Sequence, residues 1–233
     1  MPLHIGIVGC SAEGAALCYR TICAEGAGLL GPHAHPEVSM HTPSLADYVS
    51  CLDRGDLEGV GALMLASARK LASAGADFLI CPDNTIHQAF HHVESLSPLP
   101  WLHIAEEVAL AASEHGYKRL GITGTRWLVD SEVYPDKLVA KGLQYLRPSA
   151  RERDEMNRII MDELVYGVTT PAAATYFQTV IQSFKTQQCD AVVLGCTEIP
   201  LIVSDANSPL PTLDSTRLLA RAALRRAVGT CAG

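Results

Sequence analysis

The sequence predicts an α/β protein built from two similar Rossmann-like lobes, each with a mainly parallel sheet and related by a pseudo-two-fold. Three observations carry this prediction: short apolar runs alternate with amphipathic stretches of helical length, those runs are apolar throughout, and one strand–turn pattern occurs twice. Strands that alternate with helices form βαβ units around a parallel sheet. Because helices cover both faces of such a sheet, its strands need no polar positions.

The elements follow the chain in a regular order. Apolar runs predict strands at residues 4–8, 78–81, 101–104, 119–123 and 191–194. The clearest helices are predicted at residues 57–74 and 175–187, where apolar side chains recur every three or four positions. The chain therefore reads as alternating strands and helices from its first residues onward.

A repeated pattern predicts the division into lobes. Residues 4–10 resemble residues 119–125, and residues 76–83 resemble residues 189–196, at nearly equal separations. The alternative is that any two strand–turn–helix units look alike, but the matched separations argue against it. We expect a first lobe of residues 1–98 with 209–233, a second lobe of residues 99–208, and an active site in the cleft between them.

Composition excludes several classes of partner. The net charge is −7, only 18% of residues are charged, and no basic run occurs, which argues against nucleic acid and anionic membrane surfaces. No apolar stretch approaches about 20 residues, so no spanning helix is expected, and the N-terminus lacks the pattern of a signal peptide. We therefore expect a cytoplasmic protein.

The cysteines fit a cytoplasmic protein too. No CxxC pair occurs, and most cysteines sit in apolar strand or helix patterns, so reduced thiols are expected rather than a disulfide framework. No metal site is expected either. The eight cysteines are Cys10, Cys18, Cys23, Cys51, Cys81, Cys189, Cys196 and Cys231.

The repeat places two reactive side chains at matching positions. Asp83 and Cys196 follow Asp77 and Asp190 by the same number of residues, where each strand ends. Ligands of parallel α/β folds gather beyond the carboxyl ends of the strands. We therefore expect Asp83 and Cys196 to approach one cleft from opposite sides.

The surroundings of both residues suit chemistry on a small carboxylate. Cys196 follows Gly195 in a turn, and a helix starting near Thr197 would favour its thiolate and bind anions. Asn84 or Thr85 could cap a helix or hold a substrate carboxylate. The alternatives are a buried structural cysteine at position 196 and a simple N-cap aspartate at position 83.

These segments resemble the aspartate/glutamate racemase family, whose two signatures are a Cys-Asn-Thr-x-His turn and a Gly-Cys-Thr-Glu turn. The second is intact at residues 195–198, whereas the first, at residues 83–87, has aspartate in place of cysteine. Cys81 lies two residues too early to take that place. The resemblance extends over nearly the whole chain, through residues 6–9, 121–125, Tyr134, 158–164 and 213–216.

The resemblance implies a two-lobed homodimer that racemises an acidic or related amino acid without a cofactor, by two groups acting on opposite faces of the α-carbon. It makes Asp83 and Cys196 the catalytic residues. A glycine-preceded strand end at the start of the chain and the two signature turns would bind the substrate, with no metal. The expected binding residues are Ser11, Asn84, Thr85, His87, Thr125, Thr197 and Glu198.

The aspartate leaves other activities open. A carboxyl group has a reference pKa of about 3.9 and a thiol about 8.5, so aspartate is the weaker base. One alternative is a single-cysteine decarboxylase or isomerase of the same superfamily. Another is a catalytically silent relative that binds a small carboxylate.

Overall fold

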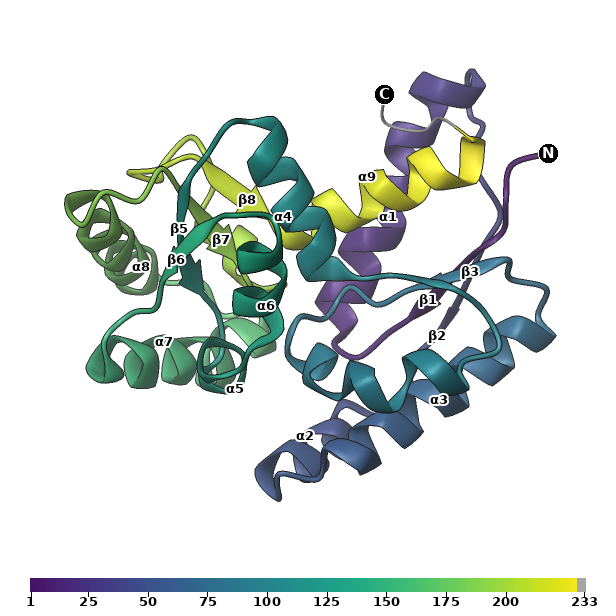
Figure 1. The fold of residues 1–233 in the computed structure, drawn as a ribbon, viewed down its shortest axis with the longest axis horizontal. Helices are drawn as coiled ribbons and strands as arrows, with labels where there is room; N and C mark the ends of the chain where they lie inside the picture. The colour runs from purple at the N-terminus through teal and green to yellow at the C-terminus, as the bar shows by residue number, and fades with distance from the viewer. Residues whose placement is uncertain (230–233) are drawn as a thin grey trace. The chain divides into compact units, whose positions relative to one another are not determined.

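A duplicated strand order defines the fold (Figure 1). The computed structural model describes residues 1–229, in which one four-stranded sheet has the order β2-β1-β3-β4 and the other the order β6-β5-β7-β8. Every strand pair in these two sheets is parallel. The predicted α/β class, with two similar lobes and parallel sheets, is confirmed.

The first compact unit comprises Met1–Glu107 and residues 216–229. Its elements are β1 (Ile5–Val8), α1 (Ala12–Leu30), β2 (Val38–His41), α2 (Leu45–Asp53), α3 (Leu57–Ser73), β3 (Phe78–Ile80), the 3-10 helices η1 (Thr85–His92) and η2 (Glu94–Leu96), β4 (Trp101–Leu102) and α9 (Ser215–Val228). Helix α4 (Ile104–Glu114) crosses the boundary between the units.

Both faces of the first sheet are covered (Figure 1). Successive side chains of a strand point to opposite faces. Ile7 and Phe78 accordingly pack with α1 and α9 in one core, whereas Val8 and Leu79 pack with α2 and α3 in another. Burial on two sides explains why the strands of this sheet are apolar throughout.

The second compact unit is Val108–Ser215. Its elements are β5 (Arg119–Thr123), α5 (Arg126–Asp130), α6 (Val133–Ala140), β6 (Gln144–Leu146), α7 (Ala150–Asp162), η3 (Leu164–Tyr166), α8 (Pro171–Thr186), β7 (Ala191–Leu194), η4 (Ile199–Leu201) and β8 (Thr212–Asp214). Helices α7 and α8 share one core cluster with β7.

The five predicted strands all form, as β1, β3, β4, β5 and β7, and the two predicted helices correspond to α3 and α8. The sequence did not reveal β2, β6 and β8. All three lie at the edges of their sheets, and β2 and β6 are only partly buried. Edge strands of this kind carry polar residues and lack the continuous apolar run by which the central strands were recognised.

The unit boundaries lie later than the expected positions after residues 98 and 208. Strand β4 bonds to β3, so Trp101–Leu102 belongs to the first sheet, and β8 bonds to β7, so Thr212–Asp214 belongs to the second. Hydrogen bonding therefore places both strands in the lobe opposite to the expected one. Cys231 and the end of the expected range 209–233 lie outside the described residues.

The two aspartates that open the repeated strands perform the same task in each unit. The His4 amide donates to the Asp77 carboxylate at 2.7 Å. In the second unit, the amides of Lys118 and Arg119 both donate to Asp190 Oδ2, at 2.6 and 3.0 Å. Each aspartate thus joins its strand to the start of the neighbouring central strand.

The Asp190 carboxylate should stabilise the second unit. In Asp190→Ala, the amides of Lys118 and Arg119 lose their acceptor, but water can replace it because the site is exposed. We expect the free energy of unfolding, measured by urea denaturation, to fall by about 1 kcal/mol. Asp154→Ala, on the exposed surface of α7, is the control and should change it by less than about 0.5 kcal/mol. Equal losses in the two variants would contradict a capping role for Asp190.

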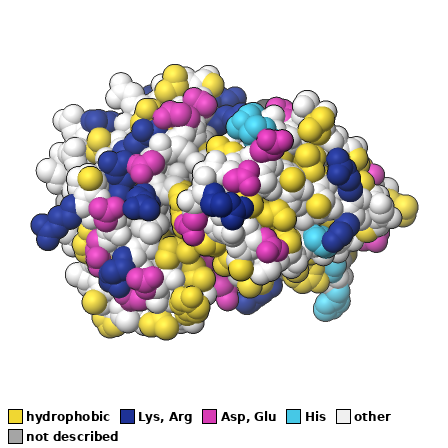
Figure 2. Space-filling model, turned by 90° about the horizontal axis from the view of Figure 1, so that it is seen from below, with side chains coloured by type: hydrophobic (Ala, Val, Ile, Leu, Met, Phe, Trp, Pro, Cys, Tyr) yellow, Lys and Arg dark blue, Asp and Glu magenta, His cyan; other side chains and the backbone are white. Residues whose placement is uncertain are grey.

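The surface shows mixed charges. On the face in Figure 2, Lys and Arg side chains lie among Asp and Glu side chains. Among the ion pairs of the protein, Arg158 pairs with Glu155 and Glu163 at 2.7 and 2.9 Å. Among the described residues, no helix has both the length and the apolar character needed to cross a membrane.

Candidate active-site turns

The Gly195–Glu198 turn begins where the fully buried strand β7 ends. A Cβ atom at Gly195 would collide with the Thr123 carbonyl oxygen and lie 2.7 Å from Leu128, so only glycine allows this close approach. The element that follows is the three-residue 3-10 helix η4, which starts at Ile199. The expected longer helix near Thr197 does not form, so a helix dipole contributes little at Cys196.

A buried carboxylate accepts a hydrogen bond from the thiol of this turn. Cys196 Sγ donates to Glu198 Oε2 at 2.9 Å, and Thr197 Oγ1 donates to the same oxygen at 2.7 Å. Cys196 is 9% exposed and Glu198 only 3%. Charge-assisted hydrogen bonds are strong when shielded from water. The thiol proton of Cys196 therefore points toward the Glu198 carboxylate.

The turn after β3 positions Asp83. Its side chain is partly buried, and Oδ1 accepts a hydrogen bond from the Ile86 amide at 3.2 Å. Asp83 therefore caps the start of η1, as the simpler alternative proposed. Asn84 occupies the N-cap position but makes no capping hydrogen bond with its side chain.

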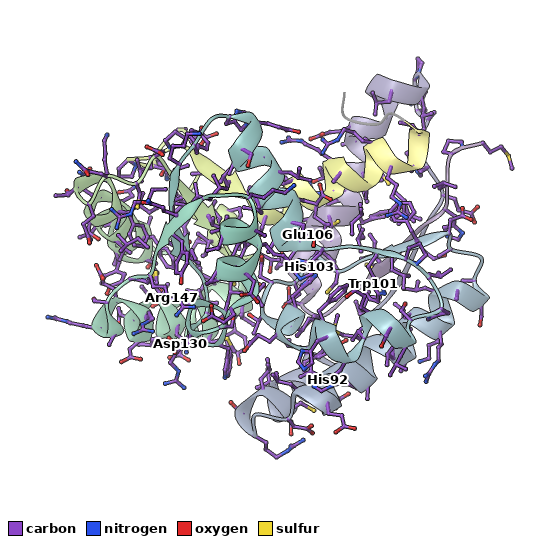
Figure 3. All side chains as sticks on the ribbon, viewed as in Figure 1. His92, Trp101, His103, Glu106, Asp130 and Arg147 are labelled. Atoms are coloured by element: carbon purple, nitrogen blue, oxygen red, sulfur yellow. The ribbon has the colours of Figure 1, made fainter. Side chains whose placement is uncertain are left out.

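His87 holds the backbone of the same turn. Its Nε2 accepts from the Ile104 amide at 3.5 Å, so its proton lies on Nδ1, which donates to the Asp83 carbonyl oxygen at 2.7 Å. The neutral ring is buried and packs edge-on against His103, with ring centroids 4.5 Å apart. His103 and Trp101 come from the β4–α4 segment (Figure 3). His87 is thus engaged in fixing Asp83.

The two capping hydroxyls occupy equivalent places in the two units. Ser11 accepts from the Gly14 amide at 3.2 Å at the start of α1, and Thr125 accepts from the Leu128 amide at 3.3 Å at the start of α5. Each hydroxyl oxygen thus accepts a backbone hydrogen bond that caps the following helix. Both residues follow the central strand of their sheet.

The structure gathers the predicted residues into two groups, one in each unit. The carboxyl ends of β1 and β3 carry Ser11, Asp83, Asn84, Thr85 and His87. The carboxyl ends of β5 and β7 carry Thr125, Cys196, Thr197 and Glu198. Within the part of the chain described here, no three metal-ligating side chains converge on one point.

The sequence did not reveal that several titratable side chains lie near Asp83. Burial, and then the nearby Cys81, Cys10 and Asp83, raise the pKa of the Tyr48 phenol. Burial and Asp83 likewise raise the pKa of the Cys81 thiol well above its ordinary value. Cys10 directly precedes Ser11, but Tyr48 lies on α2, and no local pattern connects that helix with the turn after β3.

A buried phenol also lies near the turn of the second unit. Tyr134 is almost inaccessible to solvent, and burial raises the pKa of its hydroxyl. Ser215 and Asp214 are its polar neighbours. Tyr134 therefore links α6 to the end of β8.

The sequence profile of one protein family, Asp/Glu/Hydantoin racemase, matches residues 5–223 of this chain. The chain belongs to this family. The match includes both candidate turns and every element from β1 into α9. The family resemblance noted from the sequence is confirmed.

Sequence relatives of this racemase family member include RacX of Bacillus subtilis (strain 168), a broad-specificity amino-acid racemase. The two chains are 24% identical over 161 residues, which is 68% of each. Glutamate racemase of Limosilactobacillus reuteri (strain DSM 20016) is 25% identical over 155 residues, which is 66% of this chain and 56% of the relative. The match therefore spans little more than half of that enzyme.

Solved structures match the racemase-family fold over almost its full length. A candidate Asp/Glu racemase from Yersinia pestis has a TM-score of 0.88 and 28% identity, covering 97% of this chain and 99% of its own. An aspartate racemase homologue from Pyrococcus horikoshii OT3 has a TM-score of 0.82 and 24% identity, with 96% and 98% covered. The latter likeness establishes the shared fold.

Proposed function

We propose that this member of the Asp/Glu/Hydantoin racemase family is a cofactor-independent racemase of acidic or related amino acids. The observation that carries the proposal is the 2.9 Å hydrogen bond from the Cys196 thiol to the buried Glu198 carboxylate. It places a proton acceptor beside the intact family cysteine. The similarity to racemases of broad and of glutamate specificity supports an amino-acid substrate.

In the proposed reaction, Cys196 and Asp83 act on opposite faces of the α-carbon. Cys196 passes its proton to Glu198, and the resulting thiolate removes the α-proton. The electron pair left on the α-carbon spreads into the substrate carboxylate. Protonated Asp83 then delivers a proton to the other face, which inverts the carbon and leaves an aspartate anion. The reverse direction exchanges these roles.

The substrate carboxylate is assigned to the hydroxyl and amide groups of the two turns. Asn84, Thr85 and Thr197 are proposed to supply these groups, together with the hydroxyls of Ser11 and Thr125. Such donors stabilise the negative charge that develops in the transition state. His87 and Glu198, first expected to bind substrate, are better assigned to holding Asp83 and to accepting the Cys196 proton.

Other properties expected from the family resemblance stay predictions. They are a homodimeric assembly, a cytoplasmic location and catalysis without pyridoxal phosphate or a metal. Catalysis without pyridoxal phosphate or a metal can be tested by a simple measurement. Treatment with hydroxylamine, which removes pyridoxal phosphate, or with a chelator should leave the turnover rate unchanged.

The defining measurement is exchange and inversion at the α-carbon. The protein is incubated with single L- or D-amino acids in deuterated buffer, and the α-proton signal and enantiomer ratio are followed. We expect at least one acidic or related amino acid to lose its α-proton signal and to approach a racemic mixture from either enantiomer. Heat-denatured protein provides the control. The proposal fails if no amino acid in a broad panel exchanges.

One observation favours a second candidate reaction. Only one of the two expected catalytic positions holds a cysteine, as in single-thiol decarboxylases of the superfamily. Release of CO2 from a substituted malonate, without amino-acid inversion, would indicate that lyase. Binding of a small carboxylate with neither exchange nor CO2 release would indicate a silent relative.

A further inference from the structure

The first unit has a thiol, that of Cys10, at the same edge of the sheet as Asp83. Ile7 of β1 lies beside Ile80 of β3 in their parallel pairing. Following both chains for three more residues leads to Cys10 and Asp83. The second unit repeats this relation. Ile122 pairs with Val193, and three residues later the two chains reach Thr125 and Cys196. Paired strands lie about 4.8 Å apart, so the chain leaves β1 toward Cys10 and β3 toward Asp83 at the same edge of the sheet.

A buried hydroxyl points to the same place. Tyr48 is 0% exposed, and its hydroxyl has a hydrogen bond with Ser67, which lowers the pKa of the phenol against the other influences. Tyr48 shares a core cluster with Cys10 and Cys81. Burial raises the pKa of this phenol most, and Cys81, Cys10 and Asp83 raise it further. The two thiols and the carboxyl group therefore lie near the Tyr48 hydroxyl.

We propose that Cys10 supplies the thiol that meets the substrate in the first unit, with Asp83 as its proton acceptor. This inference rests on the proposed racemase function and changes the role of Asp83 within it. Each unit would then present one thiol and one carboxylate, Cys196 with Glu198 and Cys10 with Asp83. Both faces of the α-carbon would then meet a thiol, and a thiolate is a stronger base toward carbon than a carboxylate.

The proton transfers balance in both directions. When the first unit removes the α-proton, Cys10 gives its proton to Asp83, and the Cys10 thiolate takes the proton from carbon. When it returns a proton, the Cys10 thiol protonates the carbanion and protonated Asp83 restores the thiol.

Substitutions separate this arrangement from an Asp83 that acts alone. We expect Cys10→Ala to lower the α-deuterium exchange rate by about 10²-fold or more, and Asp83→Asn to lower it by about tenfold. Cys51→Ala is the matched control, because Cys51 lies in the same core cluster and is similarly buried but belongs to α2. It should stay within about twofold of the wild type. Cys10→Ser provides a second variant if alanine impairs folding.

The opposite result would overturn the proposal. Exchange by folded Cys10→Ala or Cys10→Ser within about threefold of the wild type, with exchange abolished in Asp83→Asn, would assign the chemistry to Asp83 alone. Unfolding midpoints show whether each variant is folded.

A measurement without turnover tests the Cys10–Asp83 pair even if the racemase function fails. Iodoacetamide labelling at Cys10 is followed by mass spectrometry against pH in wild type and Asp83→Asn. Loss of the neighbouring negative charge favours the thiolate, so half-maximal labelling should move at least about half a pH unit lower. The Cys51 profile should not move. An unchanged Cys10 profile would refute the pairing, whereas absent amino-acid exchange in the wild type would refute only the racemase function.

Discussion

Cys196→Ala should lower α-proton exchange and racemisation by about 10²- to 10⁴-fold, the contribution typical of a general acid or base. In the proposed reaction, the thiol gives its proton to the buried Glu198 carboxylate, to which it already donates a hydrogen bond. Alanine removes both the base for one face of the α-carbon and the donor for the reverse reaction. The measurement is α-deuterium exchange by proton NMR, run from each enantiomer.

Cys189→Ala is the control for this variant. Cys189 packs in the same core cluster as Cys196 and is similarly buried, and burial raises the pKa of its thiol. Its replacement creates a comparable loss of packing without touching the Gly195–Glu198 turn, so the exchange rate should remain near that of the wild type. A folded Cys196→Ala protein within tenfold of the wild-type rate would remove Cys196 from the mechanism.

Gly195→Ala should damage both stability and activity. The added methyl group would collide with the Thr123 carbonyl oxygen and lie 2.7 Å from Leu128, and a backbone oxygen cannot move as a flexible side chain can. We expect the free energy of unfolding to fall by about 1–3 kcal/mol. Displacement of the adjacent Cys196 should also reduce turnover by about 10²-fold. Urea denaturation and α-deuterium exchange measure the two effects.

Gly28→Ala provides a control with the same chemical change. Gly28 lies in α1, and an added methyl group there meets no atom within 4 Å. Alanine favours the helix, so stability should rise by about 0.5–1 kcal/mol. Turnover should not change. If Gly195→Ala has the same free energy of unfolding and the same turnover rate as the wild type, the turn after β7 adapts to a side chain and its glycine is not required.

The two units differ in where the proposed thiol and its proton acceptor lie along the chain. In the second unit, one short segment contains both the thiol of Cys196 and its acceptor, Glu198. In the first unit, we infer that the thiol and the acceptor come from different strands. His87 then becomes important, because its hydrogen bond to the Asp83 carbonyl oxygen fixes a turn that must meet a neighbouring strand.

The sequence predicted the duplicated α/β fold because burial dictates composition. Central strands such as β5 and β7 are covered on both faces, so their apolar runs stand out along the chain. The repeated Asp77 and Asp190 were also visible, because the same local hydrogen bonds recur in both units. The edge strands β2, β6 and β8 were missed, since partial exposure permits polar residues.

The signature turns were also determined by the sequence, because a tight turn after a buried strand requires particular residues at adjacent positions. The family resemblance at Gly195–Glu198 needed no tertiary contact. Only the folded structure decided what the side chains do there. It turned Glu198 toward Cys196 and His87 toward the Asp83 backbone, and it brought Tyr48 of α2 close to Cys10 and Asp83. Such contacts depend on how helices pack against a sheet and on which hydrogen bonds remain when water is excluded, and neither is encoded in local sequence periodicity.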